Sequence, residues 1–314
     1  MQLQTCQSFN HRYVYECAII KDMQKNSLKK GLIIFLSFAL VISFIILDAI
    51  MIEPSRITVR RENLESEKIP EALDGMEICY FSDLDYGLYV DEKRLDTIVS
   101  KINNLGPDVV IFGGDLYDDS ITPDETGNAI LAKELAKIKA PYGKFAVYGD
   151  HDDASSELQN ATDSIYSASG FEVLANVSIS LHKKTSSSIT LVGIGNGITG
   201  KCDIETAYSN VSSNNYVLSV CHTPDTADSV PLDLTDYFIA GHSHGGQVYY
   251  VLGALVTPQM AINHLHGKNV IQDAFTLDIS DGVATTMKNI RFLTSNEIVM
   301  YRLTHTQTKE KSDS

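Results

Sequence analysis

The chain has 314 residues, of which 44% are hydrophobic, so it can bury one large core or two ordinary ones. Its 40 acidic residues outnumber its 25 lysines and arginines, which gives a formal net charge of −15. A chain this acidic lacks the basic field that nucleic-acid binding usually needs. Polynucleotides are therefore poor substrate candidates, and no nucleic-acid partner is expected.

An apolar run from Gly31 to Ile52 predicts a transmembrane signal anchor. Leu32 to Leu47 carries no charge, and Asp48 alone interrupts the apolar residues that follow. These 22 residues correspond to about 33 Å of helix, enough to cross a bilayer core of about 30 Å. A cleavable signal peptide is disfavoured, because the run is long and no small-x-small cleavage pattern follows it.

The flanks of this run predict its orientation. Five basic residues precede it and four follow within a similar distance, and the Lys29-Lys30 pair lies directly at its edge. Because basic residues favour the cytoplasmic side, we predict a single-pass protein of the cell membrane with its catalytic part on the extracytoplasmic side. Residues 1–30 are an expected N-terminal tail. Translation is expected to start at Met23, where a complete signal anchor begins.

The residues after the span divide into three parts. Residues 53–75 are predicted to be a charged juxtamembrane linker, with a short strand at residues 57–60. Residues 76–305 form the predicted body, and residues 306–314 a flexible tail rich in Ser, Asp and Lys. Cys79 and Cys221 lie inside apolar runs as small hydrophobes, so no structural disulfide is expected.

Five short apolar runs in the body each end on an Asp or a His. They are rich in β-branched and aromatic residues, which is typical of buried strands. The runs are residues 78–83, 109–115, 145–150, 217–222 and 237–242. In open α/β sheets, ligands bind beyond the carboxyl ends of the strands. The five runs therefore predict three aspartates and two histidines around one crevice.

Helical patterns lie between the first of these runs. Residues 92–103, 126–138 and 155–169 are helical candidates, and residues 189–194 are a further strand. Strand and helix in alternation indicate parallel βαβ units and an α/β fold. After His244 the pattern changes to short strand candidates at residues 248–252, 275–279 and 298–303, which are expected to complete the sheets of one domain.

The residues at the strand ends form a pattern that suits metal binding. Single aspartates after strands are usually turn or cap residues. Here they occur as Asp83-Leu84-Asp85, Gly114-Asp115, Gly149-Asp150-His151-Asp152, His222, and Gly241-His242-Ser243-His244. Three acids and three histidines at strand ends suit two divalent ions bridged by one carboxylate, an arrangement that activates water and clamps a phosphoryl group.

These motifs resemble those of the calcineurin-like metallophosphoesterase superfamily over roughly Met76 to Leu303. That family has, in order, Asp-x-His, Gly-Asp-x-x-Asp, Gly-Asn-His-Asp/Glu, a lone His and Gly-His-x-His. The order and spacing match the motifs above, with Asp118 completing the second. The closing residues 290–292 and 296–298 are similar to those of membrane-anchored bacterial members. The resemblance implies a β-sandwich flanked by helices, preceded here by one transmembrane helix.

The resemblance also implies roles for individual residues. One metal site would use Asp83, Asp85, Asp115 and His244, and the second would use Asp115 as the bridge with Asp150, His222 and His242. His151 would be a general acid or charge stabiliser at the leaving oxygen, held in orientation by Asp152. The cofactors would be two divalent ions, with Mn, Fe, Zn and Mg all open.

Two positions depart from the family pattern. Asp85 replaces a neutral His, and Asp150 replaces a neutral Asn. Four carboxylates would then neutralise two divalent ions, so phosphate is attracted less and the pKa of the activated water falls less. Three outcomes are open: an active enzyme with a higher pH optimum, selection of a harder or trivalent ion, or a slow, degenerate site.

The sequence therefore predicts a membrane-anchored, metal-dependent phosphoesterase that acts on a small or lipid-linked phosphate ester. The alternative is a degenerate, non-catalytic metal-binding envelope protein that keeps the fold. The histidines favour the enzyme, and the two carboxylate replacements favour the alternative.

Overall fold

A computed structural model of the protein describes residues 3–250 and 253–307, with the backbone alone for residues 3–20. The chain divides into two units, Met1–Ala49 and Ile50–Ser314. The first unit contains helix α1, Leu3–Leu47, which the sequence had predicted to be helical only from residue 31. The helical segment Lys21–Ser55 is long and apolar enough to cross a membrane, and only 6% of its most apolar window is buried.

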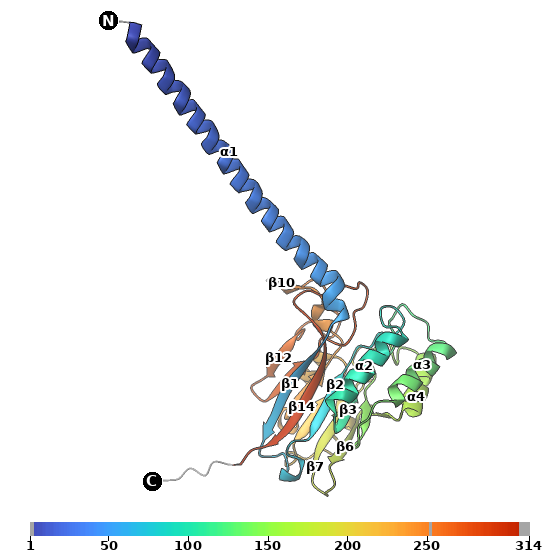
Figure 1. The fold of residues 1–314 in the computed structure, drawn as a ribbon. Helices are drawn as coiled ribbons and strands as arrows, with labels where there is room; N and C mark the ends of the chain where they lie inside the picture. The colour runs from blue at the N-terminus through green and yellow to red at the C-terminus, as the bar shows by residue number, and fades with distance from the viewer. Residues whose placement is uncertain (1–2, 251–252, 308–314) are drawn as a thin grey trace, which may run out of the picture. The chain divides into compact units, whose positions relative to one another are not determined.

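The second unit contains two six-stranded sheets (Figure 1). The first has the order β1-β14-β2-β3-β4-β5. Its strands are β1 Ile57–Ser66, β2 Glu77–Phe81, β3 Val109–Phe112, β4 Lys144–Ala146, β5 Glu172–Val173 and β14 Asn296–His305. Strands β2 to β5 run parallel, whereas β14 is antiparallel to β2 and parallel to β1. The linker predicted at residues 53–75 thus contributes a ten-residue strand to the sheet.

The second sheet has the order β12-β13-β9-β8-β7-β6. Its strands are β6 Val177–His182, β7 Ser188–Gly193, β8 Val217–Val220, β9 Tyr237–Ala240, β12 Gly267–Ile271 and β13 Phe275–Ile279. The central strands β7, β8, β9 and β13 are parallel, and β6 and β12 are antiparallel at the edges. A small hairpin, β10 Tyr249–Tyr250 with β11 Gly253–Ala254, lies outside both sheets.

Alternating side chains of the strands build three apolar layers. Ile78 and Tyr80 of β2 face Leu218 and Val220 of β8 in the layer between the two sheets. Cys79 and Phe81 point to the opposite face of the first sheet, where they pack against α2, α3 and α4. Phe238 of β9 belongs to the layer on the outer face of the second sheet. The predicted α/β sandwich with flanking helices is confirmed.

The helices begin and end at residues that local chemistry favours. They are α2 Glu92–Leu105, α3 Glu125–Ala136, α4 Ser156–Ser169 and the short α5 Ile204–Tyr208. The Asp91 carboxylate accepts a hydrogen bond from the Arg94 amide at 2.8 Å, which caps the start of α2. Gly106 ends α2 in a left-handed conformation, with φ of 65°. The first three helices connect parallel strands, so the carboxyl ends of β2, β3 and β4 lie at one edge.

Candidate metal centre

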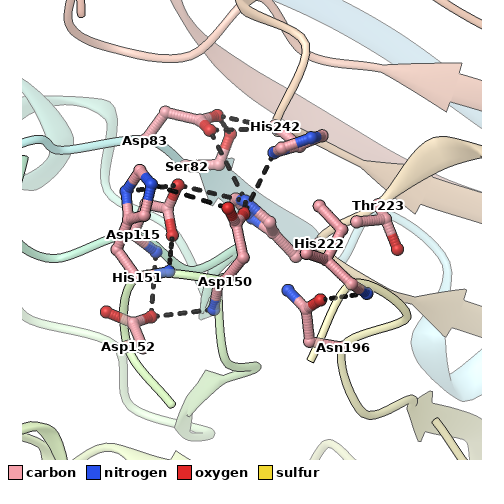
Figure 2. Close-up of polar contacts among 12 residues, drawn as sticks. Ser82, Asp83, Asp115, Asp150, His151, Asp152, Asn196, His222, Thr223 and His242 are labelled. Atoms are coloured by element: carbon pink, nitrogen blue, oxygen red, sulfur yellow. Dashed lines mark hydrogen bonds and ion pairs between the residues drawn. The ribbon is translucent and has the colours of Figure 1, made fainter. Parts of the chain in front are cut away.

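Seven predicted ligands lie within four residues of the ends of five strands, and the two sheets bring them together (Figure 2 labels five of them). Asp83 and Asp85 follow β2, Asp115 follows β3, and Asp150 follows β4. His222 follows β8, and His242 and His244 follow β9. Strands β2 to β4 belong to the first sheet and β8 and β9 to the second, so the site lies where the carboxyl ends of both sheets meet.

The backbone of this site is unusual. Five of the seven residues have positive φ angles of 47° to 67°, namely Asp83, Asp85, Asp115, His242 and His244. Asp and His are among the side chains that tolerate this conformation best, and such residues cluster at functional sites. The sharp turns after the strands therefore aim consecutive side chains into one crevice.

Two glycines allow the strand ends to approach one another closely. A Cβ atom on Gly149 would lie 1.9 Å from Asp115 Oδ1, and one on Gly241 would lie 2.4 Å from Ser82 Oγ. Real Cβ atoms do not come this close to other heavy atoms. The glycines before Asp150 and His242 are therefore needed for packing beside the carboxylates.

One group of potential ligands consists of Asp115, Asp150, His222 and His242, whose donor atoms lie within 4.8 Å of one another. His222 Nε2 lies 3.2 Å from both Asp115 Oδ2 and Asp150 Oδ1. His242 Nδ1 lies 3.1 Å from Asp150 Oδ1. This group contains the same four residues that the sequence assigned to the second metal site.

A second group shares Asp115 with the first and adds Asp85 and His151. His244 Nε2 adjoins it, at 3.5 Å from Asp85 Oδ2 and 3.7 Å from Asp83 Oδ1. Asp83 also accepts hydrogen bonds from the His242 amide at 3.0 Å and from the Ser82 hydroxyl at 2.5 Å. The structure therefore brings all four residues predicted for the first site into one neighbourhood, and it adds His151 to them.

The three ligand histidines share one hydrogen-bonding pattern. His222 Nδ1 lies 2.7 Å from the Gly113 carbonyl, His242 Nε2 lies 2.8 Å from that of Gln259, and His244 Nδ1 lies 3.1 Å from that of Ala284. A carbonyl can only accept, so each of these nitrogens carries the proton. The opposite nitrogen of each ring, which faces the carboxylates, is left free to coordinate, as is usual for metal-binding histidines.

Several inward-facing atoms lack a hydrogen-bond partner in the described part of the chain. They include both carboxylate oxygens of Asp85, Asp150 Oδ1 and His222 Nε2, all buried. Burial, and then the charges of Asp115 and Asp83, raise the pKa of Asp85 well above its usual range. Burial opposes a proton on His222, yet Asp115 and other carboxylates raise the pKa of His222 strongly. Shared cations would satisfy the same atoms, so this donor set fits divalent metal ions.

His151 lies at the edge of this cluster, with about 30% of its side chain exposed. Its Nδ1 is 3.4 Å from Asp115 Oδ2, and its Nε2 is 3.5 Å from Asp150 Oδ2. Burial opposes its charge, but Asp115 and Asp150 outweigh burial and raise the pKa of His151.

The Asp152 carboxylate contacts backbone amides of two loops of the site. Its carboxylate accepts hydrogen bonds from the amides of Asp115, Leu116 and Gly149 at 2.8 to 2.9 Å and from the Tyr166 hydroxyl at 3.3 Å (Figure 2). Within the described residues, no hydrogen bond joins it to the His151 ring. Asp152 instead holds together the loops that carry Asp115 and Asp150. Burial and the charge of Asp115 raise the pKa of Asp152 to about 6.

A hollow of about 240 Å³ opens over the cluster. Its floor includes Asp115, Asp150 and His151, and its walls include the apolar side chains of Ile198, Val256, Pro258 and Met287. A small ester can therefore lie between the carboxylate and histidine cluster on one side and an apolar wall on the other.

No role was predicted for Arg291 from the sequence, but the structure connects this residue to the site. This side chain is fully buried. It donates hydrogen bonds to the carbonyls of His244 at 2.9 Å, Ala284 at 2.7 Å and Asp281 at 2.5 Å. The Ala284 carbonyl is also the acceptor that orients the His244 ring. No sequence signal distinguishes a buried arginine from a surface one, so this contact could not be predicted.

Comparison with known proteins agrees with this geometry. Residues 76–246 match the family model described as calcineurin-like phosphoesterase. An uncharacterized metallophosphoesterase of Bacillus subtilis, YkuE, is 30% identical over 261 residues, which are 81% of this chain and 88% of that protein.

Two further relatives differ in length from this chain. A transmembrane protein with metallophosphoesterase domain from Danio rerio is 28% identical over 61% of this chain and 46% of its own length. The UDP-2,3-diacylglucosamine pyrophosphatase LpxG of Chlamydia trachomatis is 25% identical over 63% of this chain and 72% of its own. The matched family model covers more than half of the chain, with the site motifs in order. The protein belongs to the calcineurin-like phosphoesterase family.

Proposed function

We propose that this protein is a membrane-anchored, metal-dependent hydrolase of a small or lipid-linked phosphate ester, with its catalytic unit on the extracytoplasmic side. The observation that supports this best is the shared pattern of His222, His242 and His244. Each ring is fixed by a backbone carbonyl so that its free nitrogen faces buried carboxylates. Histidine rings that are fixed in this way, beside carboxylates with unpaired oxygens, are oriented to coordinate a metal ion.

The proposed ligands divide into two sets. Asp83, Asp85, Asp115 and His244 would hold one ion, and Asp115, Asp150, His222 and His242 the other. Two divalent ions held there would lower the pKa of a water molecule and neutralise charge on the phosphate oxygens. The chain itself contributes the fixed positions of these side chains, because Asp152 binds the amides of both loops that supply Asp115 and Asp150.

His151 is proposed to assist departure of the leaving group. It lies in the floor of the hollow, partly exposed, with neighbouring carboxylates that favour its protonated form. A protonated imidazole in this place can donate to the leaving oxygen or stabilise its charge.

The substrate class follows from two features. The apolar segment Lys21–Ser55 would hold the catalytic unit at a bilayer, which favours substrates present there. The relative from Chlamydia trachomatis is named for cleaving a pyrophosphate in a diacylated nucleotide sugar. A lipid-linked phosphate ester or pyrophosphate therefore belongs among the candidates, beside small soluble esters.

The alternative is a metal-binding protein without turnover. The buried Asp85, which is 1% exposed and stands where the family motif has His, favours this alternative. It adds negative charge where phosphate must bind, and its side chain is shorter than that of His.

The two proposals differ in whether the protein hydrolyses a phosphate ester. The full chain, purified in detergent with Mn²⁺, should hydrolyse at least one ester in a panel of monoesters, diesters and pyrophosphates, and a chelator should abolish this activity. Metal binding with no turnover of any ester across the pH range would favour the alternative.

The His151→Ala variant should lose activity by roughly 10²-fold, because proton transfer contributes about that factor. Its metal content should remain close to that of the parent, since none of the seven proposed ligands is changed. The control is His264→Ala, because His264 pairs with Asp228 at 2.8 Å outside the described ligand groups. Unchanged turnover in His151→Ala would remove this side chain from the mechanism.

A further inference from the structure

A second, smaller hollow adjoins the one over the ligand cluster. It measures about 120 Å³ and is lined by Gly246, Gln247, Val248, Leu255, Val256, Met287, Lys288 and Ile290. Four of these residues, Gly246, Gln247, Val256 and Met287, also line the larger hollow. The two hollows therefore adjoin each other, and we call the smaller one the apolar groove because most of its side chains are hydrophobic.

The apolar groove is held in shape by hydrogen bonds at its base. The Gln247 side chain donates to the Thr286 carbonyl at 2.9 Å and accepts from the Thr286 amide at 3.1 Å. The Phe292 amide donates to the Gln247 carbonyl at 2.9 Å, and the Tyr249 amide donates to the Phe292 carbonyl at 2.8 Å. These bonds tie Gln247 and Tyr249 to Thr286 and Phe292, which flank residues 287–290 on either side, so the groove is preformed.

The walls of the groove expose apolar surface. Leu255 is 68% exposed, Met287 is 62% exposed, and Val256 is 42% exposed. Single exposed hydrophobic side chains are common on protein surfaces. Three of them along one groove that leads to a polar site instead indicate a surface for an apolar ligand.

Residues 51–55, at the start of the second unit, lie beside residues 284–289 of the same unit. Met51, Pro54 and Ser55 share a hollow with Ala284, Thr285 and Asn289, which flank the Met287 wall of the groove. Asn296 Nδ2 also donates to the Pro54 carbonyl at 2.7 Å. Within this unit, residues 51–55 therefore lie beside the loop that continues into the Met287 wall of the groove.

We propose that the apolar groove holds part of the hydrocarbon chain of a lipid-linked phosphate ester whose phosphate lies over the ligand cluster. This inference rests on the proposed function and narrows its substrate to a membrane lipid. A volume of 120 Å³ equals about four water molecules at ~30 Å³ each, so the groove holds a segment of one chain next to the head group.

The test uses the absence of tryptophan from the sequence. A Leu255→Trp variant of the full chain carries a single fluorescent reporter in the groove, and Lys288→Trp places one on the opposite wall. The proteins are placed in phosphatidylcholine nanodiscs and loaded with Zn²⁺. The probe is a dodecylphosphonate with bromine on its terminal carbon, since bromine quenches tryptophan on contact and the phosphonate is not hydrolysed. Bromododecanol, which enters the bilayer without a phosphate-like group, is the matched probe.

The phosphonate should quench both groove reporters several-fold more than the alcohol does, and a chelator should remove the difference. The control variant is Val270→Trp, since Val270 is 67% exposed in edge strand β12 and does not line the groove. Equal quenching by both probes would mean that these residues rest on the bilayer, which would overturn the inference. Quenching absent from both reporters would also overturn it. Selective quenching would support lipid binding in the groove whether or not an ester is hydrolysed. A failure of this inference can therefore be distinguished from a failure of the proposed function.

Discussion

Asp85 and Asp150 give the proposed centre its distinctive charge. Both have oxygens that are buried and unpaired in the described chain, and Asp150 Oδ1 lies between His222 and His242. With Asp83 and Asp115 they supply four negative charges, which would balance two divalent ions. At contact distance in a poorly solvated crevice, such charges interact strongly. The centre should therefore be less electrophilic than one with a neutral His and a neutral Asn.

The double variant Asp85→His with Asp150→Asn tests this charge balance. A more positive centre lowers the pKa of the water it activates, so the acid limb of the rate profile should move to lower pH. Turnover near neutral pH should rise, and each single variant should move the profile part of the way. The measurement is the pH dependence of kcat and the metal content of all four proteins. A double variant with the parent's pH profile and metal content would show that neither residue matters to the centre.

Arg291 should act as a positioning residue for His244. An Arg291→Lys variant keeps the charge but cannot reach the three carbonyls that the guanidinium binds. Loss of such support for a ligand typically weakens metal binding by about 10- to 100-fold. Titration with Mn²⁺, followed by electron paramagnetic resonance, should show this loss. Arg302→Lys is the control, because Arg302 is exposed and pairs with Glu77 at 3.3 Å. Parent-like Mn²⁺ affinity in Arg291→Lys would contradict the positioning role.

At the scale of the elements, strand β1 connects the apolar span to the catalytic fold. It pairs with β14 over ten residues, and Arg60 in it reaches across to the second sheet. Arg60 binds the Glu297 carboxylate at 3.0 and 3.1 Å and the buried Asp278 at 2.9 Å. Tyr237 and Tyr301 donate to the same Asp278 oxygen at 3.0 and 2.9 Å. These contacts fix β1 against both sheets.

Removal of Arg60 should therefore destabilise the fold. Loss of one partner leaves Asp278 buried without its counter-charge, which costs about 3 kcal/mol for a fully buried pair and less here because a quarter of Arg60 is exposed. We expect the Tm of Arg60→Met in detergent to fall by about 5 °C. The control is the adjacent Arg61→Met, since Arg61 is 60% exposed and 3.8 Å from Glu77. An equal Tm for the two variants would show that the Arg60 contacts contribute little to the stability of the fold.

Elements with strong local signals were predicted well. The five apolar runs became β2, β3, β4, β8 and β9, and the three long helices lie within two residues of their expected starts. Strands β5, β6 and β12 were missed, because they are short or lie at sheet edges with one exposed face, where hydrophobic alternation is weak. Strand β1 was extended from four to ten residues by its pairing with β14, a partner more than two hundred residues away in the chain.

The candidate site was predictable to the extent that its residues follow strands. The order of the motifs predicted seven ligands, and the structure brings these seven side chains together. The contacts of Asp152 and Arg291 could not be predicted, since they depend on which backbone amides and carbonyls meet in the folded loops. The apolar groove was also missed, because residues 246–248 and 255–256 meet residues 287–290 only in the folded chain.

For the whole molecule, the chain combines an acidic catalytic unit with an apolar N-terminal helix. The net charge of −15 for the whole chain makes non-specific binding to anionic polymers unfavourable. The helical segment Lys21–Ser55 is apolar and exposed, which suits a bilayer rather than a protein core. We propose that the two together confine hydrolysis to esters at the membrane surface.

The metal content of the full chain tests the central claim most directly. The protein, purified in detergent with Mn²⁺ in excess and then freed of unbound ions, should contain close to two ions per chain by elemental mass spectrometry. Asp115→Asn should lose at least one of them, because Asp115 belongs to both ligand groups. A parent protein with almost no bound metal would contradict the account, since the histidines and carboxylates at the five strand ends would then have another purpose.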